Sequence, residues 1–501
     1  MAQYIMSLDQ GTTGSRCIIF SLDGALKAAQ SMEYPLFYPR PGWVEQDPYD
    51  ILTSQLSVAK KAVETAEIEW SEIAALGITN QRETTILWDR KTGKPVSNAI
   101  VWQCRRTAED CAKLKENGLE ATIRQKTGLL CDPYFSATKI KWLLDNIEGL
   151  RQRAQRGEIL FGTVDTWLIW NLSGGKIHAT DYTNASRTML FNIHTLSWDE
   201  ELLRLFDIPP EILPTVQPSC SFFGMTDASV LGAALPISGV AGDQQAALFG
   251  QCCFEEGELK NTYGTGGFLL MNTGTSPVNA SGGLLTTVAC DVEGKVHYAL
   301  EGSIFICGAV IQWIRDGLGL ISSASESEEV AKVAPDNGGV YLVPAFVGLG
   351  APYWDPYARG AIFGLTRSSN KHHIVRAAIE SMAYQTYEVI SAMESACGIK
   401  ISSLKVDGGA AKNDLLLQFQ SDILDIEVVR PYCFETTALG AAYLAGLATG
   451  LYKNTEEIRM LAQKSNIFRS NMSDVDRKKL IAGWHNAVHR TLNYDIYEKT
   501  D

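Results

Sequence analysis

The sequence predicts an α/β protein built from two large, related halves around a central nucleotide cleft. Two Gly/Thr-rich loops support this prediction, because each lies between two short apolar runs typical of a β-hairpin. The first loop is residues 9–16, and the second, residues 263–267, follows about half of the 501-residue chain later. A third observation is the turn Asp407-Gly408-Gly409, which follows another short apolar run. Glycine-rich loops at strand ends let the backbone approach an anion, so the cleft is expected to hold a nucleotide.

The patterns between these loops predict the remaining elements in chain order. Short apolar runs in the first half predict strands at 4–8, 17–20, 73–78 and 237–241. Helices are expected at 49–66, after Asp47-Pro48, and within 134–146, while four prolines make 207–224 an irregular connection. The second half is expected to have strands on both sides of its loop between 258 and 272, a strand at 404–406 and a helix at 412–424.

The Ala- and Gly-rich run 438–451 is the most apolar stretch of the chain. It falls short of the roughly 20 residues that span a bilayer. The run therefore predicts a buried helix that packs closely against a neighbour, and no membrane span.

Length and composition exclude several classes of protein. At about 150 residues per domain the length suggests about three domains, but the paired loops favour two, 1–250 and 251–501, with a boundary near 245–257. With 46% hydrophobic and 20% charged residues, the chain is neither mainly disordered nor fibrous. A formal net charge of −13 argues against nucleic acid as a partner. Eleven cysteines without a C-x-x-C pair, and an N-terminus without a signal-peptide pattern, predict a cytoplasmic protein.

Two aspartates at predicted strand ends are candidates for phosphate chemistry. Asp9 follows the first strand, where its carboxylate would hold magnesium against phosphate oxygens; an Asx-type turn is the alternative. Asp243 ends a strand in an apolar stretch, where it would accept a proton from a substrate hydroxyl. A helix N-cap for residues 244–250 is the alternative, and residue type alone favours it. Neither a Walker motif nor a Rossmann fingerprint occurs.

The adjacent pair Arg82-Glu83 follows the buried strand at 73–78 and suits a polyol. Arginine donates and glutamate accepts hydrogen bonds, so together they would grip neighbouring hydroxyls. A structural ion pair is the alternative, and it is the better explanation of the pair taken alone. Trp102 and Tyr134 would supply apolar walls for a small carbon chain, although such aromatic residues are more often part of a core.

Several blocks of sequence resemble one known family, in that family's order. The blocks are residues 9–16, 77–84, 102–106, 161–167, 181–187, 242–250 and 348–356. Over about residues 4 to 490 the chain resembles the FGGY carbohydrate kinases, in particular the members that phosphorylate glycerol. The resemblance implies the actin/Hsp70-like fold, with an RNase H-like core in each of two domains around a central nucleotide cleft.

The resemblance also implies an activity and the residues that perform it. The activity is transfer of a phosphoryl group from ATP to glycerol, giving sn-glycerol 3-phosphate and ADP, with Mg2+ and in a homodimer or homotetramer. The implied glycerol ligands are Arg82, Glu83, Tyr134, Asp243 and Gln244, with Trp102 and Phe268 as apolar walls and Asp243 as general base. The implied phosphate loop is Thr12, Thr13, Gly14 and Arg16, with Asp9 as the magnesium-linked carboxylate. The implied nucleotide residues are Thr265, Gly308, Gln312, Gly409 and Asn413.

Three departures from the family pattern concern nucleotide contact and regulation. Gly14 stands where many members have serine, so one hydroxyl contact to phosphate is lost. The segment 226–236 lacks the basic, glycine-rich loop tied to fructose bisphosphate inhibition. No histidine lies between His194 and His297, so the histidine phosphorylated in some members is missing.

Two other functions stay open: another FGGY kinase acting on a pentitol or ketose, and a non-catalytic actin-like ATPase switch.

Overall fold

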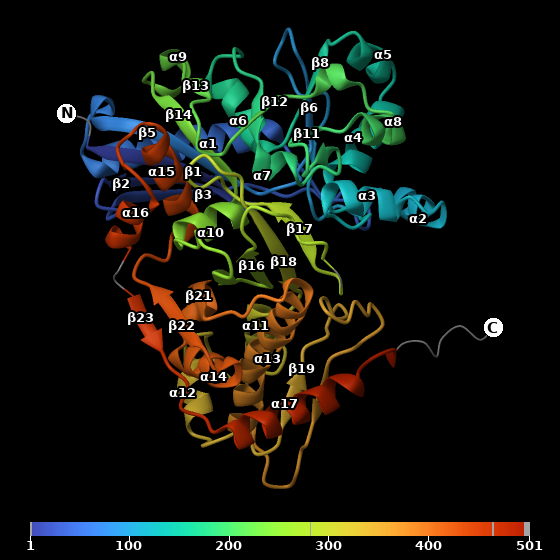
Figure 1. The fold of residues 1–501 in the computed structure, drawn as a ribbon, viewed down its shortest axis with the longest axis vertical. Helices are drawn as coiled ribbons and strands as arrows, with labels where there is room; N and C mark the ends of the chain where they lie inside the picture. The colour runs from blue at the N-terminus through green and yellow to red at the C-terminus, as the bar shows by residue number, and fades with distance from the viewer. Residues whose placement is uncertain (1–2, 281, 463–464, 495–501) are drawn as a thin grey trace.

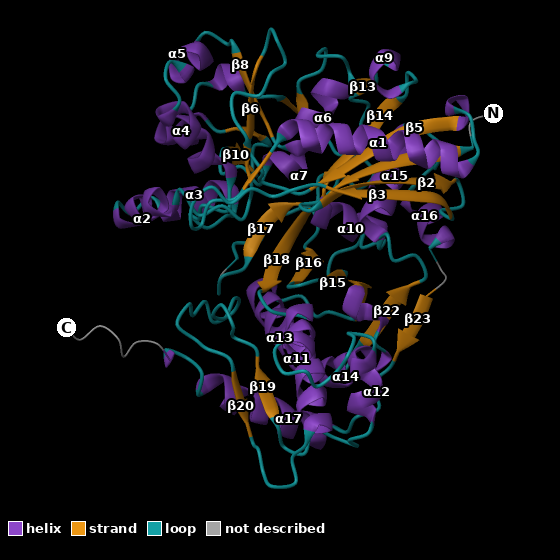
Figure 2. Ribbon diagram, turned by 180° about the vertical axis from the view of Figure 1, so that it is seen from behind, coloured by secondary structure: helices purple, strands orange, loops and turns teal. Residues whose placement is uncertain are grey.

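The computed structural model describes residues 3–280, 282–462 and 465–494. The chain forms two halves stacked along the long axis of the molecule, blue to green in one half and mostly yellow to red in the other (Figure 1). Each half contains a mixed β-sheet with helices packed against it (Figure 2). The predicted two-part α/β architecture is therefore confirmed.

The first sheet is organised around the N-terminal hairpin. Strand β1 (Tyr4–Gln10) pairs antiparallel with β2 (Gly14–Ser21) and parallel with β5 (Ile73–Asn80). The full order is β3 (Leu26–Glu33), β2, β1, β5, β14 (Pro236–Gly242) and β13 (Gly224–Met225). Helices α1 (Pro48–Ala66) and α6 (Val164–Leu172) share one core with this sheet. The predicted helix start is confirmed, because the Asp47 carboxylate accepts the N–H of Tyr49 at 2.8 Å.

The second sheet repeats the first in order and direction. Strand β15 (Leu259–Tyr263) pairs antiparallel with β16 (Gly267–Asn272) and parallel with β21 (Ser403–Gly408). On one side follow β22 (Glu427–Pro431) and the antiparallel β23 (Ser465–Phe468), and on the other β18 (Tyr298–Ile304) and β17 (Leu285–Val288). Leaving out β17, each sheet has a three-stranded antiparallel meander, two parallel strands and one antiparallel edge strand. The two halves are thus related by topology.

Each half also lends a helix to the other. Helix α10 (Asp243–Gly250) follows the last parallel strand of the first half and packs against β15 and β16 of the second. Helix α15 (Thr436–Ala448) follows β22 and packs against β1, β5 and β14 of the first sheet (Figures 1 and 2). The two helices meet at a glycine: a Cβ added to Gly440 would lie 1.9 Å from the carbonyl oxygen of Ala246. The close packing predicted for 438–451 is confirmed.

The remaining elements cover these sheets or extend the first half sideways. In the first half they are β4 (Glu45–Gln46), η1 (Trp70–Glu72), β6 (Ile86–Asp89), β7 (Ala99–Ile100), α2 (Ala108–Glu116), α3 (Glu120–Thr127), α4 (Ser136–Asn146), α5 (Leu150–Gln155), β8 (Ile159–Gly162), β9 (Ala179–Asp181), α7 (Tyr182–Ala185), β10 (Phe191–Asn192), β11 (Ser197–Trp198), α8 (Glu200–Phe206), η2 (Pro210–Ile212), β12 (Thr215–Gln217) and α9 (Ala228–Leu231). In the second half they are α11 (Gly308–Asp316), α12 (Glu326–Lys332), β19 (Tyr341–Val343), β20 (Ala361–Phe363), α13 (Lys371–Cys397), η3 (Gly409–Lys412), α14 (Asp414–Leu424), α16 (Thr455–Leu461) and α17 (Asp474–His489).

Three element boundaries differ from the sequence predictions. Strand β1 continues through Asp9 and Gln10, and β2 begins at Gly14, so the first loop shrinks to residues 11–13. The helix predicted to begin at 412 begins at Asp414, because the 3-10 turn η3 comes first. The connection at 207–224 is not wholly irregular, since it contains η2 and β12, which pairs with β9.

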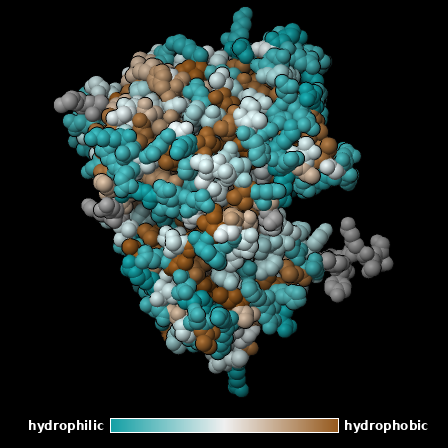
Figure 3. Space-filling view, viewed as in Figure 1, coloured by the Kyte–Doolittle hydropathy of each residue, from teal (hydrophilic) through white to brown (hydrophobic). Residues whose placement is uncertain are grey.

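Figure 3 shows how hydrophilic and hydrophobic residues are distributed over one outer face of the molecule. Hydrophilic residues cover much of this face, and hydrophobic residues form small groups scattered from its upper to its lower part. Within the described ranges, no helix combines the length and the apolar character needed to cross a bilayer.

Candidate functional site

Strand register brings the predicted site residues of the first half together. The parallel strands β1, β5 and β14 end side by side, with Gln10 opposite Asn80 and Asn80 opposite Gly242. Arg82 and Glu83 follow β5 after one intervening residue, and Asp243 comes directly after β14. Ligands of open α/β sheets bind at this carboxyl edge, which agrees with the predicted acceptor site.

Arg82 lies at the centre of this group. Its Nε is 3.3 Å from Oδ1 of Asp243 and 3.9 Å from Oε1 of Glu83. Neighbouring residues of an extended chain face opposite sides, but the φ of +61° at Glu83 breaks that alternation and leaves both side chains in one region. Arg82 and Glu83 are buried, whereas the Asp243 side chain is 32% exposed. A reacting group can therefore reach Asp243 from solvent.

The structure contradicts the alternative readings of both aspartates. Asp243 is the first residue of α10, and Gly242 is the N-cap, so Asp243 does not cap the helix. Its Oδ1 does accept the N–H of the next residue, Gln244, at 2.7 Å. Asp9 lies inside β1 opposite Arg16 rather than in a turn, so the Asx-turn reading is wrong.

Aromatic side chains border this group. The rings of Trp102 and Tyr134 meet edge to face with centroids 5.5 Å apart. The indole N–H of Trp102 donates to Oγ1 of Thr12 at 2.9 Å, which joins this border to the first hairpin tip. Phe268 comes from the second half, where it lies opposite Thr262 in the β15–β16 hairpin. The two halves thus both supply residues predicted to contact the acceptor.

Gln244 faces the second half through a buried lysine. Its Oε1 accepts a hydrogen bond from Nζ of Lys260 at 2.5 Å, and the same Nζ donates to Oγ1 of Thr262 at 2.9 Å. Burial lowers the pKa of Lys260 to about 8, although the nearby carboxylates of Asp407 and Asp243 act in the opposite direction. Lys260 therefore places a titratable ammonium group between the two halves.

The two hairpin tips have similar closures. The N–H of Gly11 donates to the carbonyl of Gly14 at 2.9 Å, and the N–H of Gly264 donates to the carbonyl of Gly266 at 2.8 Å. Thr13 and Thr265 are exposed at these tips, with their hydroxyls available to a ligand. A Cβ at Gly14 would lie 2.9 Å from the carbonyl oxygen of Met32, so strand β3 leaves little room for the serine found in many FGGY kinases.

The predicted nucleotide residues surround the second tip. The N–H of Gly308, at the start of α11, donates to the carbonyl of Gly264 at 2.9 Å. A Cβ at Gly308 would lie 2.6 Å from that same oxygen, so glycine is needed for this approach. Gln312 is exposed one turn later on α11.

The other two predicted nucleotide residues follow β21, which pairs with β15 so that Gly408 lies opposite Tyr263. Gly409 is exposed, and a Cβ added there would have no atom within 4 Å. Asn413 is the N-cap of α14, where its Oδ1 accepts the N–H of Leu416 at 2.9 Å. The side-chain amide oxygen of Asn413 is therefore already hydrogen-bonded to the first turn of the helix.

Charged side chains of both halves lie near the first hairpin tip. Arg16 forms an ion pair with Glu435 of the second half, with Nη1 and Oε2 2.9 Å apart. Burial raises the pKa of Asp9 to about 7; Arg16 opposes this shift, and the carboxylates of Asp243 and Glu435 add to it. Within residues 3–280, 282–462 and 465–494, no three His, Cys, Asp or Glu side chains are grouped to hold a metal ion.

Sequence reasoning missed four buried charged residues at this site: Lys260, described above, and Arg187, Glu301 and Lys139. Arg187 donates from Nε to Oε1 of Glu83 at 2.6 Å, and Glu301 accepts from Nη1 of Arg82 at 2.6 Å. Lys139 donates to the carbonyl oxygens of Tyr134 at 2.7 Å and Glu83 at 3.3 Å, and burial lowers its pKa to about 7. The available signal was a single charge inside an apolar run, as in Tyr298-Ala299-Leu300-Glu301.

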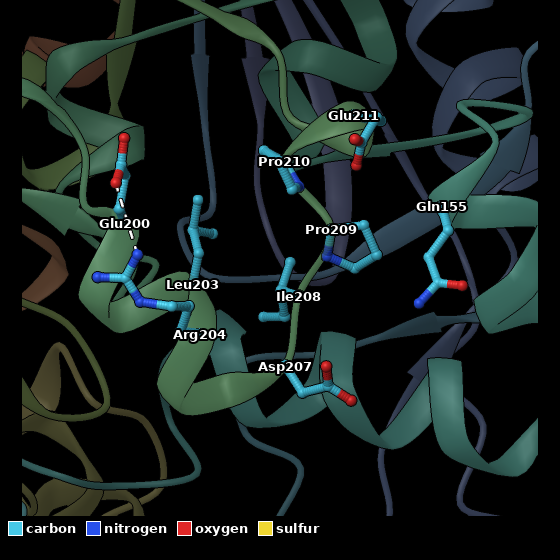
Figure 4. Close-up of a pocket in the computed structure, with 9 residues that line it drawn as sticks. All are labelled: Gln155, Glu200, Leu203, Arg204, Asp207, Ile208, Pro209, Pro210 and Glu211. Carbon is cyan, nitrogen blue, oxygen red and sulfur yellow. Dashed lines mark ion pairs between the residues drawn. The ribbon is translucent and has the colours of Figure 1, made fainter.

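A surface pocket of about 480 Å³ lies elsewhere in the first half (Figure 4). Its walls come from α5, α8 and η2, and Glu200 and Arg204 form an ion pair at its margin with an N–O distance of 3.5 Å. None of the residues lining it is a predicted site residue. This pocket is therefore separate from the predicted site at the strand ends and hairpin tips.

The fold is that of a sugar or polyol kinase, and the chain belongs to the FGGY family of carbohydrate kinases. The family's N-terminal domain model matches residues 4–250, and its C-terminal domain model matches residues 259–449.

Relatives along the whole chain are more specific. Glycerol kinase of Clostridium botulinum (strain 657 / Type Ba4) is 60% identical over 498 residues, which cover 99% of this chain and 100% of that protein. Glycerol kinase 2 of Thermotoga maritima is 60% identical over 493 residues, or 98% of this chain and 99% of that one. A crystal structure of Plasmodium falciparum glycerol kinase with ADP superposes with a TM-score of 0.93 at 38% identity, and the match covers 98% of both chains.

Proposed function

We propose that the protein phosphorylates glycerol with ATP, giving sn-glycerol 3-phosphate and ADP by direct in-line transfer. The observation that carries this proposal is the position of Arg82, Glu83 and Asp243. They form a compact donor and acceptor set at one sheet edge, beside the Trp102–Tyr134 border. The full-length relatives named glycerol kinase support a three-carbon polyol as the acceptor.

Each group in the site has a role in this transfer. Asp243 accepts the proton of the terminal hydroxyl as that oxygen attacks the γ-phosphorus, and Arg82, 3.3 Å from its carboxylate, orients it. Thr12, Thr13 and Thr265, with the backbone amides of the tips, would hold the transferring phosphoryl group. Arg82, Glu83, Tyr134 and Gln244 would bind the hydroxyls, and Trp102 and Phe268 would border the carbons. Gly308, Gln312, Gly409 and Asn413 would form the adenosine side.

The donor set fits a magnesium ion bound together with phosphate. Asp9 has the raised pKa of a carboxylate that burial and two neighbouring carboxylates make costly to ionise, and a cation would remove that penalty. Mg2+ commonly uses one or two carboxylates plus phosphate oxygens and water, so a third protein ligand is not needed. When bound, the ion would neutralise charge on the β- and γ-phosphates. Asp9 would hold the ion. Arg16 and Gly14 belong to the same hairpin.

Three further properties belong to this proposal. The domains would be 1–250 and 251–501, which the two family models support, since one ends at 250 and the other begins at 259. Residues 1–2, 281, 463–464 and 495–501 of these domains lie outside the described ranges. The protein would be cytoplasmic, in line with its use of ATP and its eleven free cysteines. The homodimer or homotetramer implied by the family resemblance stays a prediction, which analytical ultracentrifugation tests.

An acceptor panel tests the proposed reaction. ADP release is measured by a coupled assay with glycerol, erythritol, xylulose or no acceptor at saturating MgATP. Glycerol should give the highest kcat/KM, and release without acceptor should be slow because the reaction needs a bound hydroxyl in place of water. Higher kcat/KM with xylulose would instead identify another FGGY kinase. Equal release with and without acceptors would identify an ATPase switch.

A further inference from the structure

A carboxylate from the second half holds two arginines of the first half. Glu301 lies on β18 and is 1% exposed. Its Oε2 accepts from Nη1 of Arg82 at 2.6 Å, and its Oε1 accepts from Nη2 of Arg187 at 2.9 Å. Each oxygen therefore serves a different guanidinium group, and neither arginine can rotate without losing a charged hydrogen bond.

Each arginine that binds Glu301 also contacts another residue predicted to bind the acceptor. The Nε of Arg187 donates to Oε1 of Glu83 at 2.6 Å, and the Nε of Arg82 lies 3.3 Å from Oδ1 of Asp243. The guanidinium of Arg187 also lies over the Tyr134 ring, 5.7 Å from its centroid. Through one intervening arginine, Glu301 is thus linked to three predicted acceptor ligands: Glu83, Asp243 and Tyr134.

The charges of this cluster depend on one another. Burial alone would raise the pKa of Glu301, but Arg187 and Arg82 outweigh it and lower the pKa to about 2. Glu301 is therefore ionised throughout the neutral range. Without this charge, two buried guanidinium groups would face only the carboxylates of Glu83 and the partly exposed Asp243. Arg82 would keep two close side-chain acceptors, Gln245 at 3.1 Å and Asp243 at 3.3 Å.

A purely structural ion pair between the halves is the competing explanation. Such a pair needs one contact between one cation and one anion. Here the same carboxylate instead fixes the relative positions of Arg82 and Arg187, and so of the donor and the acceptor that would grip neighbouring hydroxyls. That arrangement determines how the site is shaped, besides holding the halves together.

We propose that Glu301 is a positioning residue of the acceptor site, which orients Arg82 directly and Glu83 through Arg187. The proposal rests on the proposed phosphorylation of a polyol and adds that the grip on its hydroxyls is complete only when β18 lies against the first half.

The variant Glu301→Gln tests this role because it keeps the shape and removes the charge. The KM for glycerol should rise at least about 10-fold, while the KM for ATP stays within about twofold, because only acceptor ligands depend on Glu301. The preference for glycerol over 1,2-propanediol, measured as a ratio of kcat/KM values, should also fall. Propanediol lacks one hydroxyl, so it gains less from a correctly oriented Arg82 and Glu83.

Glu380→Gln is the matched control. Glu380 is also a buried carboxylate of the second half and lies on α13, outside the predicted site. It accepts hydrogen bonds from Arg376 at 2.8 Å and from Asn337 at 2.9 Å. Its loss should lower the Tm without changing the glycerol-to-propanediol ratio. If Glu301→Gln lowers the Tm but leaves the glycerol KM and this ratio unchanged, Glu301 is only structural and the inference is overturned.

Arg187→Lys provides a second route if Glu301→Gln does not fold. Lysine keeps the charge but lacks the fork that serves Glu83 and Glu301 together, so the glycerol KM and the acceptor ratio should change in the same direction. Unchanged values would again overturn the inference. The wild-type assay separates the two proposals: no glycerol-dependent ADP release refutes the proposed function, whereas normal wild-type activity with unaffected variants refutes only the role of Glu301.

Discussion

The indole N–H of Trp102 donates to the hydroxyl oxygen of Thr12 at 2.9 Å. This single bond joins the border of the proposed acceptor site to the first phosphate tip, two parts of the chain that are 90 residues apart. The carbonyl of Thr12 also accepts from Nε2 of Gln46 at 2.5 Å, so the tip is held from two sides. Acceptor and phosphoryl donor would therefore be positioned by connected groups, as in-line transfer requires.

Trp102→Phe should lower kcat about twofold to tenfold, the loss expected for one hydrogen bond of about 0.5–1.5 kcal/mol. The ring stays, so the KM for glycerol should change less than kcat. Steady-state ADP release measures both constants. Trp198→Phe is the control, because its indole N–H donates to the carbonyl of Pro214 at 2.9 Å and no predicted site residue contacts it there. Equal kinetics in the two variants would show that the Trp102–Thr12 bond has no part in turnover.

Asp243→Asn should lower kcat by at least about 100-fold, the lower end of general-base contributions. The amide cannot take the hydroxyl proton, but it keeps the size of the side chain. Because that side chain is 32% exposed, the fold should be retained. Circular dichroism and the increase in Tm with glycerol check folding and binding separately from turnover. Near-normal kcat would remove Asp243 from the role of base.

The kcat/KM for MgATP should depend on the ionisation of Asp9. Burial raises the pKa of its carboxyl to about 7, so the group is neutral below that pH and anionic above it. Only the anion holds a cation well, so kcat/KM for MgATP should fall about tenfold per pH unit as the pH drops below about 7. Asp9→Asn should lose this step and be weak at every pH. A wild-type profile that stays flat between about pH 6 and 8 would contradict the assignment.

Gly440→Ala should destabilise the protein by about 1–3 kcal/mol. The added Cβ would lie 1.9 Å from the carbonyl oxygen of Ala246, and because this is a backbone atom of α10, a rotamer change cannot relieve the clash. Urea unfolding measures the loss. Gly409→Ala is the control for stability, since its Cβ would meet nothing within 4 Å. Equal midpoints for the two variants would mean that α10 and α15 can separate without cost.

Local sequence patterns predicted the parts of the site that depend on neighbours in the chain. Glycine and threonine between two apolar runs indicated both hairpin tips, and β1–β2 and β15–β16 have that form. Asp9, Asp243 and the Arg82-Glu83 pair were visible because each comes after a short apolar run of sequence. Their exact boundaries were not, because strand pairing extends the elements beyond the apolar residues themselves.

Long-range partners were beyond the reach of sequence patterns. Arg82 and Glu301 are 219 residues apart, and Arg187 and Glu301 are 114 apart, so neither spacing identifies a pair. The composition of the run 438–451 predicted close packing because small residues allow backbones to approach. It did not predict that α15 lies on the first sheet, since this depends on the crossing with α10.

The exchange of α10 and α15 has a consequence for how the chain is made. Ile5, Ile18 and Phe20 of the first sheet share their core with Leu444 and Ala445 of α15. A ribosome releases the N-terminal residues first, and from the end of β14 at Gly242 nearly 200 more residues are made before α15 begins at Thr436. The part of the core on this side of the first sheet is therefore complete only when almost the whole protein has been translated. These strands are made first, and the helix that covers them is among the last elements to be made.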